Sequence, residues 1–218
     1  MMKNIRKKKD VGIYGITAKW YDKNSRKSRM AEMQRYAHEV ASHVSKNANI
    51  LEVAPGPGYL SIELAKKGFS VTGVEISPDF VEIEKHNAKE ANVSVDFKEG
   101  NAANLPCEDN FFDFIVCSAA FKNFKDPVKV LYEMHRVLKQ GGTALIIDMD
   151  YGATSEDIEN EVREMKGFDK YFVKFAFKTF LKKGAYTRED FEKLLKETPF
   201  KNYKIKNEGF CLYIYLYK

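Results

Sequence analysis

The fold is decided by the stretch Ile50-Leu51-Glu52-Val53-Ala54-Pro55-Gly56-Pro57-Gly58-Tyr59. Its apolar first half predicts a buried strand, and its glycines predict a tight turn before a helix. Glycines at positions 56 and 58 let the backbone approach a ligand closely, and their amides lie near the positive end of the following helix. The stretch therefore predicts a site for a nucleotide-like ligand at the carboxyl end of a strand.

Short runs rich in Val and Ile alternate with segments of helical period on both sides of this turn. Such alternation is typical of βα units in a parallel sheet. Two helix starts agree with it, because Ser77-Pro78 and Asp126-Pro127 each place an N-cap residue before a proline. Gly141 can close the second of these helices. The expected strands are 49–54, 70–75, 93–98, 112–118 and 143–149.

The flanking segments add helices and a hairpin. Apolar residues from Met30 to Val44 follow the spacing of an amphipathic helix, which we expect to cover one sheet face. Residues 155–182 predict one or two helices, and Thr187 with Asp190 resembles a capping box that opens another. The tail 202–218 alternates around Asn207-Glu208-Gly209 and predicts a terminal β-hairpin.

Composition places the chain among single-domain proteins. Its 218 residues, 44% of them hydrophobic, are enough for one substantial core. No apolar run approaches the roughly 20 residues that span a bilayer, and the N-terminus is charged where a secretory signal is apolar. We expect a soluble, cytoplasmic protein with no membrane partner. The three cysteines form no CxxC pair, so no metal site is predicted.

The charge is uneven along the chain. Residues 1–30 hold ten Lys and Arg against Asp10 and Asp22, a net charge of 10 − 2 = +8, while the whole chain carries +5. A basic arm of this kind can touch nucleic acid, but a solvated terminus is its commoner meaning. Nucleic acid is therefore disfavoured as a partner.

An acidic residue follows the glycine turn at the spacing expected of a ribose-binding carboxylate. Glu75 ends the second predicted strand, seventeen residues after Gly58, where a carboxylate can accept hydrogen bonds from both ribose hydroxyls. A nicotinamide-dependent oxidoreductase would share this acid but needs a third glycine, and Ser61 stands in that position. Glu52, inside the first strand, also has no role in a dinucleotide loop. The oxidoreductase is thus the weaker alternative.

Five motifs in order carry a resemblance to a known family, from about residue 49 to residue 149. The chain resembles the class I S-adenosylmethionine-dependent methyltransferases, especially the group that acts on small molecules. The motifs are Glu52-Val-Ala-Pro-Gly-Pro-Gly58, Val71-Thr-Gly-Val-Glu-Ile-Ser77, Gly100-Asn-Ala-Ala-Asn-Leu-Pro106, Phe112-Asp-Phe-Ile-Val116 and Arg136-Val-Leu-Lys-Gln-Gly-Gly142.

The resemblance implies that the cofactor is S-adenosyl-L-methionine and that strand ends hold it. The residues implied at its methionine end are Glu52, Ala54, Gly56, Gly58 and Ser118. Those implied at its adenosine are Glu75 on the ribose, Ile76 on the adenine face, and Asn101 and Ala102 on the adenine edge. Three positions depart from the family pattern: Ala54 replaces a glycine, Asn101 replaces an aspartate, and Lys122-Asn123 stand where many relatives have histidines.

These segments and the resemblance together predict an α/β fold. We expect a Rossmann-like seven-stranded sheet, mostly parallel with a C-terminal antiparallel hairpin, helices on both faces and a small helical insertion after the fifth strand. One domain would comprise an N-terminal arm and helix (1–48), a cofactor-binding core (49–149), a helical insertion or lid (150–200) and the terminal hairpin (201–218).

The implied reaction is in-line methyl transfer to a small, apolar or aromatic acceptor. No base is evident, and the candidates near the transferable methyl are Tyr14, Tyr21, Asp148 and Asp150. A stripe of aromatic residues between Phe168 and Phe180 would either dock the insertion or line the acceptor pocket. Two alternatives stay open: a nucleic-acid-modifying methyltransferase and a non-catalytic adenosylmethionine-binding protein. The sequence indicates neither the oligomeric state nor the acceptor atom.

Overall fold

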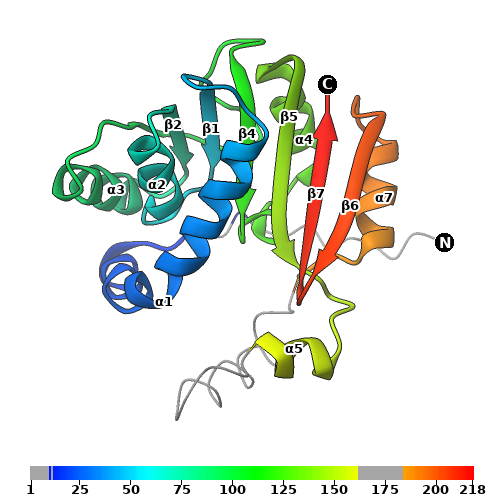
Figure 1. Ribbon diagram of the computed structural model, residues 1–218, viewed down its shortest axis with the longest axis horizontal. Helices are drawn as coiled ribbons and strands as arrows, with labels where there is room; N and C mark the ends of the chain where they lie inside the picture. Colours follow the sequence, from blue (N-terminus) through cyan, green and yellow to red (C-terminus); the bar gives the residue numbers. More distant parts are fainter. Residues whose placement is uncertain (1–9, 11, 162–183) are drawn as a thin grey trace.

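A seven-stranded sheet forms the centre of the computed structural model, which describes residues 10, 12–161 and 184–218 (Figure 1). The strand order is β3-β2-β1-β4-β5-β7-β6, with β1 to β5 parallel and β7 antiparallel to both of its neighbours. The predicted mostly parallel sheet with a terminal hairpin is confirmed. The strands are β1 (Asn49–Val53), β2 (Ser70–Glu75), β3 (Asp96–Glu99), β4 (Phe112–Ser118), β5 (Leu138–Met149), β6 (Asn202–Glu208) and β7 (Cys211–Tyr217).

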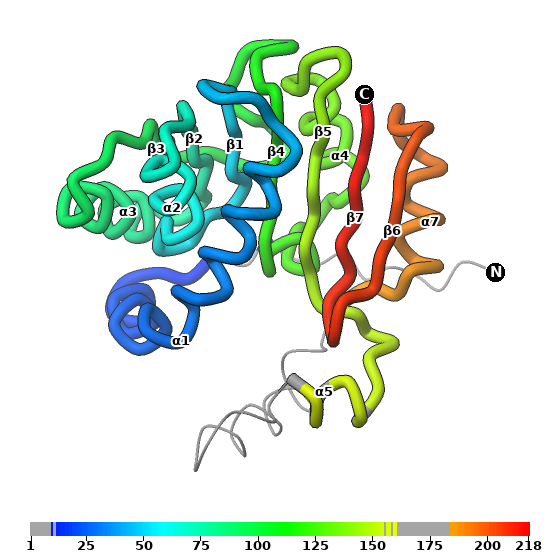
Figure 2. The backbone as a smooth tube through the Cα atoms, in the orientation of Figure 1, coloured from blue at the N-terminus to red at the C-terminus, as the bar shows by residue number. Residues whose placement is uncertain are grey.

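Helices cover both faces of this sheet (Figure 2). On one face lie α1 (Gly15–Ser42), α2 (Tyr59–Lys66) and α3 (Pro78–Glu90). On the other lie α4 (Pro127–Val137) and α7 (Arg188–Lys196), which contact each other. A short helix, α5 (Ser155–Glu161), follows β5 away from the sheet.

The central strands are buried on both sides because their side chains alternate between two apolar layers. In β4, Phe114 and Val116 pack in the layer under α1 and α2, whereas Ile115 and Cys117 pack in the layer under α4 and α7. All four side chains are fully buried. The two apolar layers hold the carboxyl ends of β1, β2 and β4 side by side at one end of the strands.

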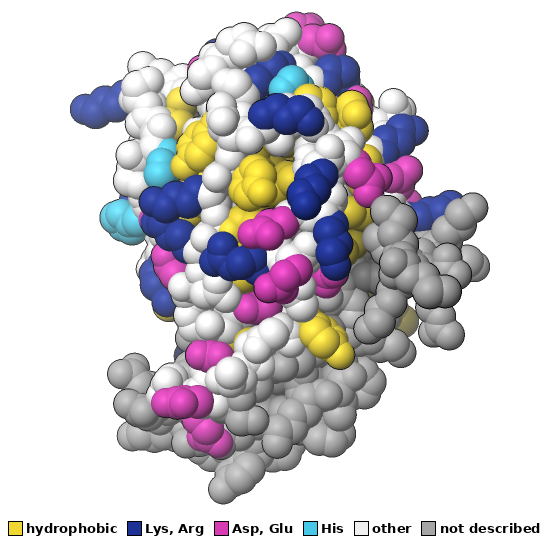
Figure 3. Space-filling model, turned by 90° about the vertical axis from the view of Figure 1, so that its right-hand side faces the viewer, with side chains coloured by type: hydrophobic (Ala, Val, Ile, Leu, Met, Phe, Trp, Pro, Cys, Tyr) yellow, Lys and Arg dark blue, Asp and Glu magenta, His cyan; other side chains and the backbone are white. Residues whose placement is uncertain are grey.

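The hairpin strand β6 forms one edge of the sheet. It carries Lys204 and Lys206 between its apolar positions, and edge lysines oppose pairing with another chain. Figure 3 faces this side of the molecule and shows lysine, arginine and acidic side chains scattered among hydrophobic ones. The surface here mixes both signs of charge.

Several predicted boundaries differ from the structure. The edge strand β3 is shorter than the predicted 93–98, and β5 begins five residues before the predicted start. Gly141 does not close a helix, because α4 already ends at Val137; it lies inside β5 with φ +78° and donates a hydrogen bond to the carbonyl of Lys218 at 3.0 Å. The predicted caps at Ser77, Asp126 and Thr187 are confirmed. The aromatic stripe between 168 and 180 lies outside the described residues.

One buried side chain in α3 lacks any partner. Glu84 is fully buried beside Gly58, and neither of its carboxyl oxygens has a hydrogen-bond partner in the described part of the chain. Burial, together with the nearby carboxyls of Glu75 and Glu52, raises the pKa of Glu84 to about 10. The native protein therefore keeps this carboxyl protonated at neutral pH.

Replacing Glu84 should change how stability depends on pH. The unfolded chain releases this proton near the ordinary value of 4.5, whereas the native protein keeps it up to about pH 10. Since the unfolded state binds fewer protons in between, this group lowers the unfolding free energy as pH rises from 5 to 9. Urea titrations of Glu84→Gln should show a flatter fall over this range. Removal of the orphaned acid by Glu84→Met should stabilise the protein at pH 8 by about 1–3 kcal/mol.

The matched control is Glu82→Gln, because Glu82 lies on the same helix with 80% of its side chain exposed. Its pH dependence should follow that of the wild type. Parallel curves for wild type and Glu84→Gln would contradict a protonated Glu84 in the folded protein.

Candidate functional site

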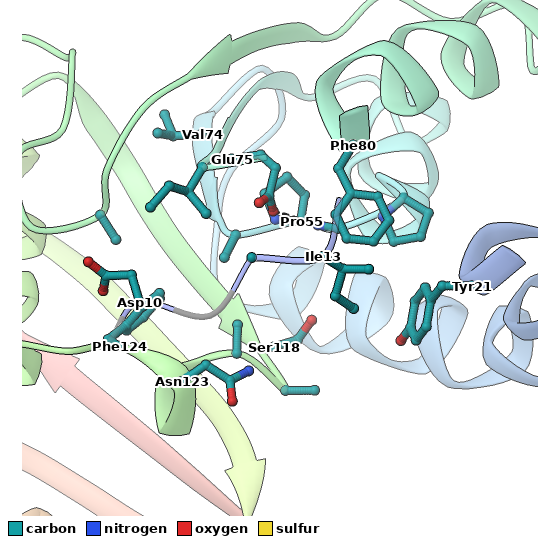
Figure 4. Close-up of a pocket in the computed structure, with 18 of the residues that line it drawn as sticks. Asp10, Ile13, Tyr21, Pro55, Val74, Glu75, Phe80, Ser118, Asn123 and Phe124 are labelled. Atoms are coloured by element: carbon teal, nitrogen blue, oxygen red, sulfur yellow. Dashed lines mark hydrogen bonds between the residues drawn. The ribbon is translucent and has the colours of Figure 1, made fainter. Parts of the chain in front are cut away.

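A cavity of about 220 Å³ lies where β1, β2 and β4 end (Figure 4). Its walls come from the glycine turn after β1, the ends of β2 and β4, the loop after β3 and the N-terminal part of the chain. Of the nine residues that the resemblance assigned to the cofactor, seven line it: Ala54, Gly56, Glu75, Ile76, Asn101, Ala102 and Ser118. Parallel strands bring these distant residues to one edge.

The turn after β1 owes its shape to left-handed backbone at Ala54, Gly56 and Gly58, whose φ angles are +56°, +62° and +78°. Gly56 lines the cavity, and a methyl group there would meet no atom within 4 Å. At Gly58 a Cβ would lie 3.0 Å from the Phe97 ring, so this glycine serves packing and does not line the cavity. Left-handed backbone costs a non-glycine residue about 1–2 kcal/mol, which explains why glycine is usual where Ala54 stands.

Glu75 joins the end of β2 to this turn. One carboxyl oxygen accepts a hydrogen bond from the amide of Ser77 at 3.0 Å, and the other accepts from the amide of Gly56 at 3.2 Å. The side chain is 4% exposed, and burial raises its pKa. An ionised carboxylate has about four lone-pair sites, so Glu75 retains acceptor capacity toward the cavity.

Glu52 lies behind the cavity wall and does not line it. Its side chain is 1% exposed and accepts a hydrogen bond of 2.5 Å from the hydroxyl of Ser61. Burial raises the pKa of Glu52 to about 7, against the opposing charge of Arg29.

Arg29 is a lining residue that the sequence analysis missed. It projects from α1 into the cavity wall, and its Nε lies 3.1 Å from a carboxyl oxygen of Glu32. The predicted helix began only at Met30, whereas α1 begins at Gly15, so Arg29 fell outside the predicted element. An earlier helix start would have placed it one turn from Met33, another lining residue.

The N-terminal strap, defined here as residues 10, 12 and 13, also lines the cavity. Asp10 accepts hydrogen bonds from the amide of Lys125 at 2.9 Å and from the side-chain nitrogen of Asn101 at 3.3 Å. The carbonyl of Ile13 accepts one from the Ser77 hydroxyl at 2.6 Å. In Figure 4, Asp10 lies beside Phe124 and Ile13 lies toward Tyr21.

Both polar atoms of the Asn101 side chain form hydrogen bonds within the protein. Its side-chain oxygen accepts a hydrogen bond from the amide of Ala103 at 2.8 Å, while its nitrogen donates to Asp10. The expected pairing of this oxygen with an adenine amino group would therefore have to compete with a bond inside the turn.

The four candidate bases lie in different surroundings. Tyr21 lines the cavity, with its ring edge-on to Phe80 at 6.0 Å, whereas Tyr14 is 50% exposed and does not line it. Asp148 is buried and accepts hydrogen bonds from both the ammonium and the amide of Lys122, at 2.9 and 2.8 Å. Asp150 is buried too.

The carboxyl oxygens of Asp150 accept from the amide of Gly152 at 2.7 Å and from the side chain of Asn207 at 2.8 Å. Asp148 thus ties the segment after β4 to β5, and Asp150 stabilises the chain just after β5. Among the four candidates, Tyr21 alone borders the cavity in the part of the chain that the structure describes.

Comparison with known proteins agrees with this geometry. Residues 51–146 match the protein family described as "Methyltransferase domain". Over 109 residues the chain is 37% identical to a demethylmenaquinone methyltransferase of Listeria welshimeri, a match that covers 48% of this chain and 46% of that protein. The chain therefore spans about half the length of the curated relatives it matches.

Solved structures extend the likeness to nearly the whole chain. A candidate S-adenosyl-L-methionine-dependent methyltransferase from Methanococcus maripaludis is 26% identical with a TM-score of 0.73, covering 93% of this chain and 92% of that one. The plantazolicin methyltransferase BpumL, solved in complex with SAH, covers 93% and 88% with a TM-score of 0.66. At 15% identity it shows the shared fold alone.

The fold, the motifs and the matched domain together define the class of the protein. The matched domain, and the likeness of nearly the whole chain to the Methanococcus maripaludis structure, support the class I S-adenosylmethionine-dependent methyltransferases and confirm the resemblance found in the motifs. The cofactor of this family is S-adenosyl-L-methionine.

Proposed function

We propose that this chain transfers a methyl group from S-adenosyl-L-methionine to a small aromatic acceptor of the quinone class. The observation that carries the proposal is the cavity at the ends of β1, β2 and β4, which Glu75 borders from one side and Tyr21 from another. The curated relatives include demethylmenaquinone methyltransferases, and this supports a quinone-class acceptor.

The residues at the cavity suit the adenosine half of the cofactor. Glu75 has acceptor capacity left for the two ribose hydroxyls after its bonds to Gly56 and Ser77. Ile76 and Ile13 supply apolar walls of the kind that a purine ring packs against. Gly56 leaves open space where any side chain would project.

The methionine half carries a carboxylate, an ammonium and a sulfonium. Arg29 is the cation that would bind the carboxylate, since a guanidinium matches a carboxylate in shape and charge. Glu52 lies behind the turn, where its charge would favour the positive centres of the cofactor. Ser118, Ala54 and Gly58 complete the proposed surroundings, with Gly58 acting through the shape of the turn.

Bound S-adenosyl-L-methionine supplies a methyl group that the sulfonium already activates. The chain has to exclude water and align the acceptor with the carbon–sulfur bond. Tyr21, Met33 and Phe124 provide aromatic and apolar walls for that purpose. We assign to the Tyr21 hydroxyl the contact with the acceptor's polar group, because Asp148 and Asp150 already bond within the fold.

Methyl transfer is tested directly with cofactor labelled in its methyl group. The expected product is labelled quinol when a reduced naphthoquinone lacking its ring methyl is offered. Histamine, glycine and RNA in parallel reactions should remain unlabelled. A protein that binds the cofactor yet labels none of these acceptors would support a non-catalytic binder, and labelled RNA would support a nucleic-acid enzyme.

Tyr21→Phe should lower kcat in that assay by about a hundredfold or more, as expected when a hydroxyl that contacts the acceptor's polar group and exchanges a proton with it is lost. The cofactor Kd should stay within about twofold, since the ring remains. Tyr14→Phe is the matched control, because Tyr14 precedes the same helix but does not line the cavity. Equal turnover in both variants would remove the proposed role of Tyr21.

A further inference from the structure

The outer face of the first turns of α1 exposes large apolar side chains. Ile16 is 87% exposed and Trp20 is 63% exposed, and they lie four residues apart, on the same side of the helix. Tyr14, at the N-cap, is 50% exposed. No other large apolar side chain in the described ranges 12–161 and 184–218 exceeds 60% exposure.

Polar contacts on the opposite side of α1 hold this face outward. Asp22 accepts hydrogen bonds from the Tyr59 hydroxyl at 2.7 Å and from the Asn87 side chain at 3.0 Å. Arg26 pairs with Glu90 at 3.1 Å. These bonds join α1 to α2 and α3, so the helix cannot roll to bury Trp20. The exposed apolar face is therefore built into the fold.

Exposed lysines extend and flank the same face. Lys23 and Lys27 follow Ile16 by seven and eleven residues, which keeps them on its side of the helix, and Lys19 lies one turn before Lys23 at the flank that faces α3. The acids that face this region are Asp22, which bonds inward, and Asp79 and Glu82 of α3, which share a groove with Lys19.

These lysines belong to the first thirty residues of the sequence, which together carry a net charge of 10 − 2 = +8. The hairpin side of the molecule instead mixes both signs (Figure 3). The face around Trp20 is thus the apolar face that lies within the basic part of the chain.

We propose that this face docks on an anionic phospholipid surface, with Ile16 and Trp20 at the headgroup level and Lys19, Lys23 and Lys27 among the phosphates. Tryptophan suits the boundary between water and lipid, and lysine stems lie along apolar surface while their ammonium groups reach the phosphates. A nucleic acid could use the lysines and the indole, but it offers nothing to an aliphatic side chain as exposed as Ile16. The surface of a bilayer offers both an apolar layer and phosphates, so it can accommodate all five side chains.

Docking would also bring the cavity to the lipid. Tyr21 and Arg29 line the cavity from the same helix that carries Ile16 and Trp20. An apolar quinone dissolves in the bilayer, so a docked α1 would shorten its path to the site; this step rests on the proposed function. None of the helices in the described ranges is long and apolar enough to cross a bilayer, and the proposal concerns surface contact.

The single tryptophan of the sequence, Trp20, reports on the contact directly. Vesicles of phosphatidylcholine with phosphatidylglycerol should shift its emission to the blue, and lipids brominated near the headgroup should quench it. Vesicles of phosphatidylcholine alone should do neither at the same lipid concentration, and high salt should weaken the effect. No shift and no quenching with anionic vesicles would overturn the proposal.

Co-sedimentation of full-chain variants with vesicles distinguishes the contribution of the apolar side chains from that of the lysines. Ile16→Ser, and the triple change Lys19→Gln, Lys23→Gln and Lys27→Gln, should each weaken binding about tenfold or more. The control triple Lys193→Gln, Lys196→Gln and Lys204→Gln removes equal charge from the hairpin side and should bind like the wild type. Unfolding temperature and cofactor affinity should not change in either set.

Other occupants of the face are outcomes that overturn the proposal. Tighter binding to RNA or duplex DNA than to anionic vesicles, lost in the same variants, would assign it to nucleic acid. A dimer that Ile16→Ser dissociates, with no lipid quenching of Trp20, would assign it to a second copy. Vesicle binding without quinol methylation would keep the docking surface and remove only its link to the proposed acceptor.

Discussion

The carboxylate of Glu75 links β2 to the glycine turn after β1, because it accepts hydrogen bonds from the amides of Gly56 and Ser77. Ser77 caps α3, and Gly58 at the other end of the turn begins α2. One buried side chain therefore fixes the turn and the start of the next helix against the sheet. The cavity depends on this link, since its walls are these same segments.

Acidic side chains are concentrated around that link. Glu52, Glu75 and Glu84 are all buried near the turn, and Arg29 is the cation that opposes Glu52. Desolvation raises the pKa of each carboxyl, so the site disfavours several negative charges at once, and Glu84 stays protonated. A ligand with positive centres would favour the ionised forms of Glu52 and Glu75, as the sulfonium and ammonium of the proposed cofactor would. Glu84 does not line the cavity.

The sequence predicted best those strands and helices whose residues show a clear local pattern. The bounds of β2 and β4 were predicted to the residue, because strands buried on both faces stand out as apolar runs between turns. The edge strand β3 was placed too early, since one exposed side leaves it a weak pattern. The start of α1 was missed because its first turns have no apolar stripe. Polar bonds, such as the one from the Tyr59 hydroxyl to Asp22, hold them in place instead.

The site was predicted mainly where a motif spans it, with Ser118 and Tyr21 as the lining residues named outside the motifs. The turn, Glu75 and Ile76 belong to continuous motifs, whereas Asp10 reaches the cavity through tertiary contacts that no local spacing reveals. The bond from the Lys125 amide to Asp10 joins residues 115 positions apart. The hydrogen bond from the Lys122 ammonium to Asp148 likewise depends on the pairing of β4 with β5.

The central claim is that Glu75 both holds the turn and binds the ribose. Calorimetric titration of S-adenosyl-L-methionine into wild type, Glu75→Gln and Glu75→Ala tests it most directly, with unfolding temperatures measured alongside. Gln keeps one acceptor and Ala keeps none, so Ala should lose more affinity, about 1–3 kcal/mol or roughly 5- to 150-fold. Wild-type affinity in both variants would contradict the account, because the ribose would then lie elsewhere.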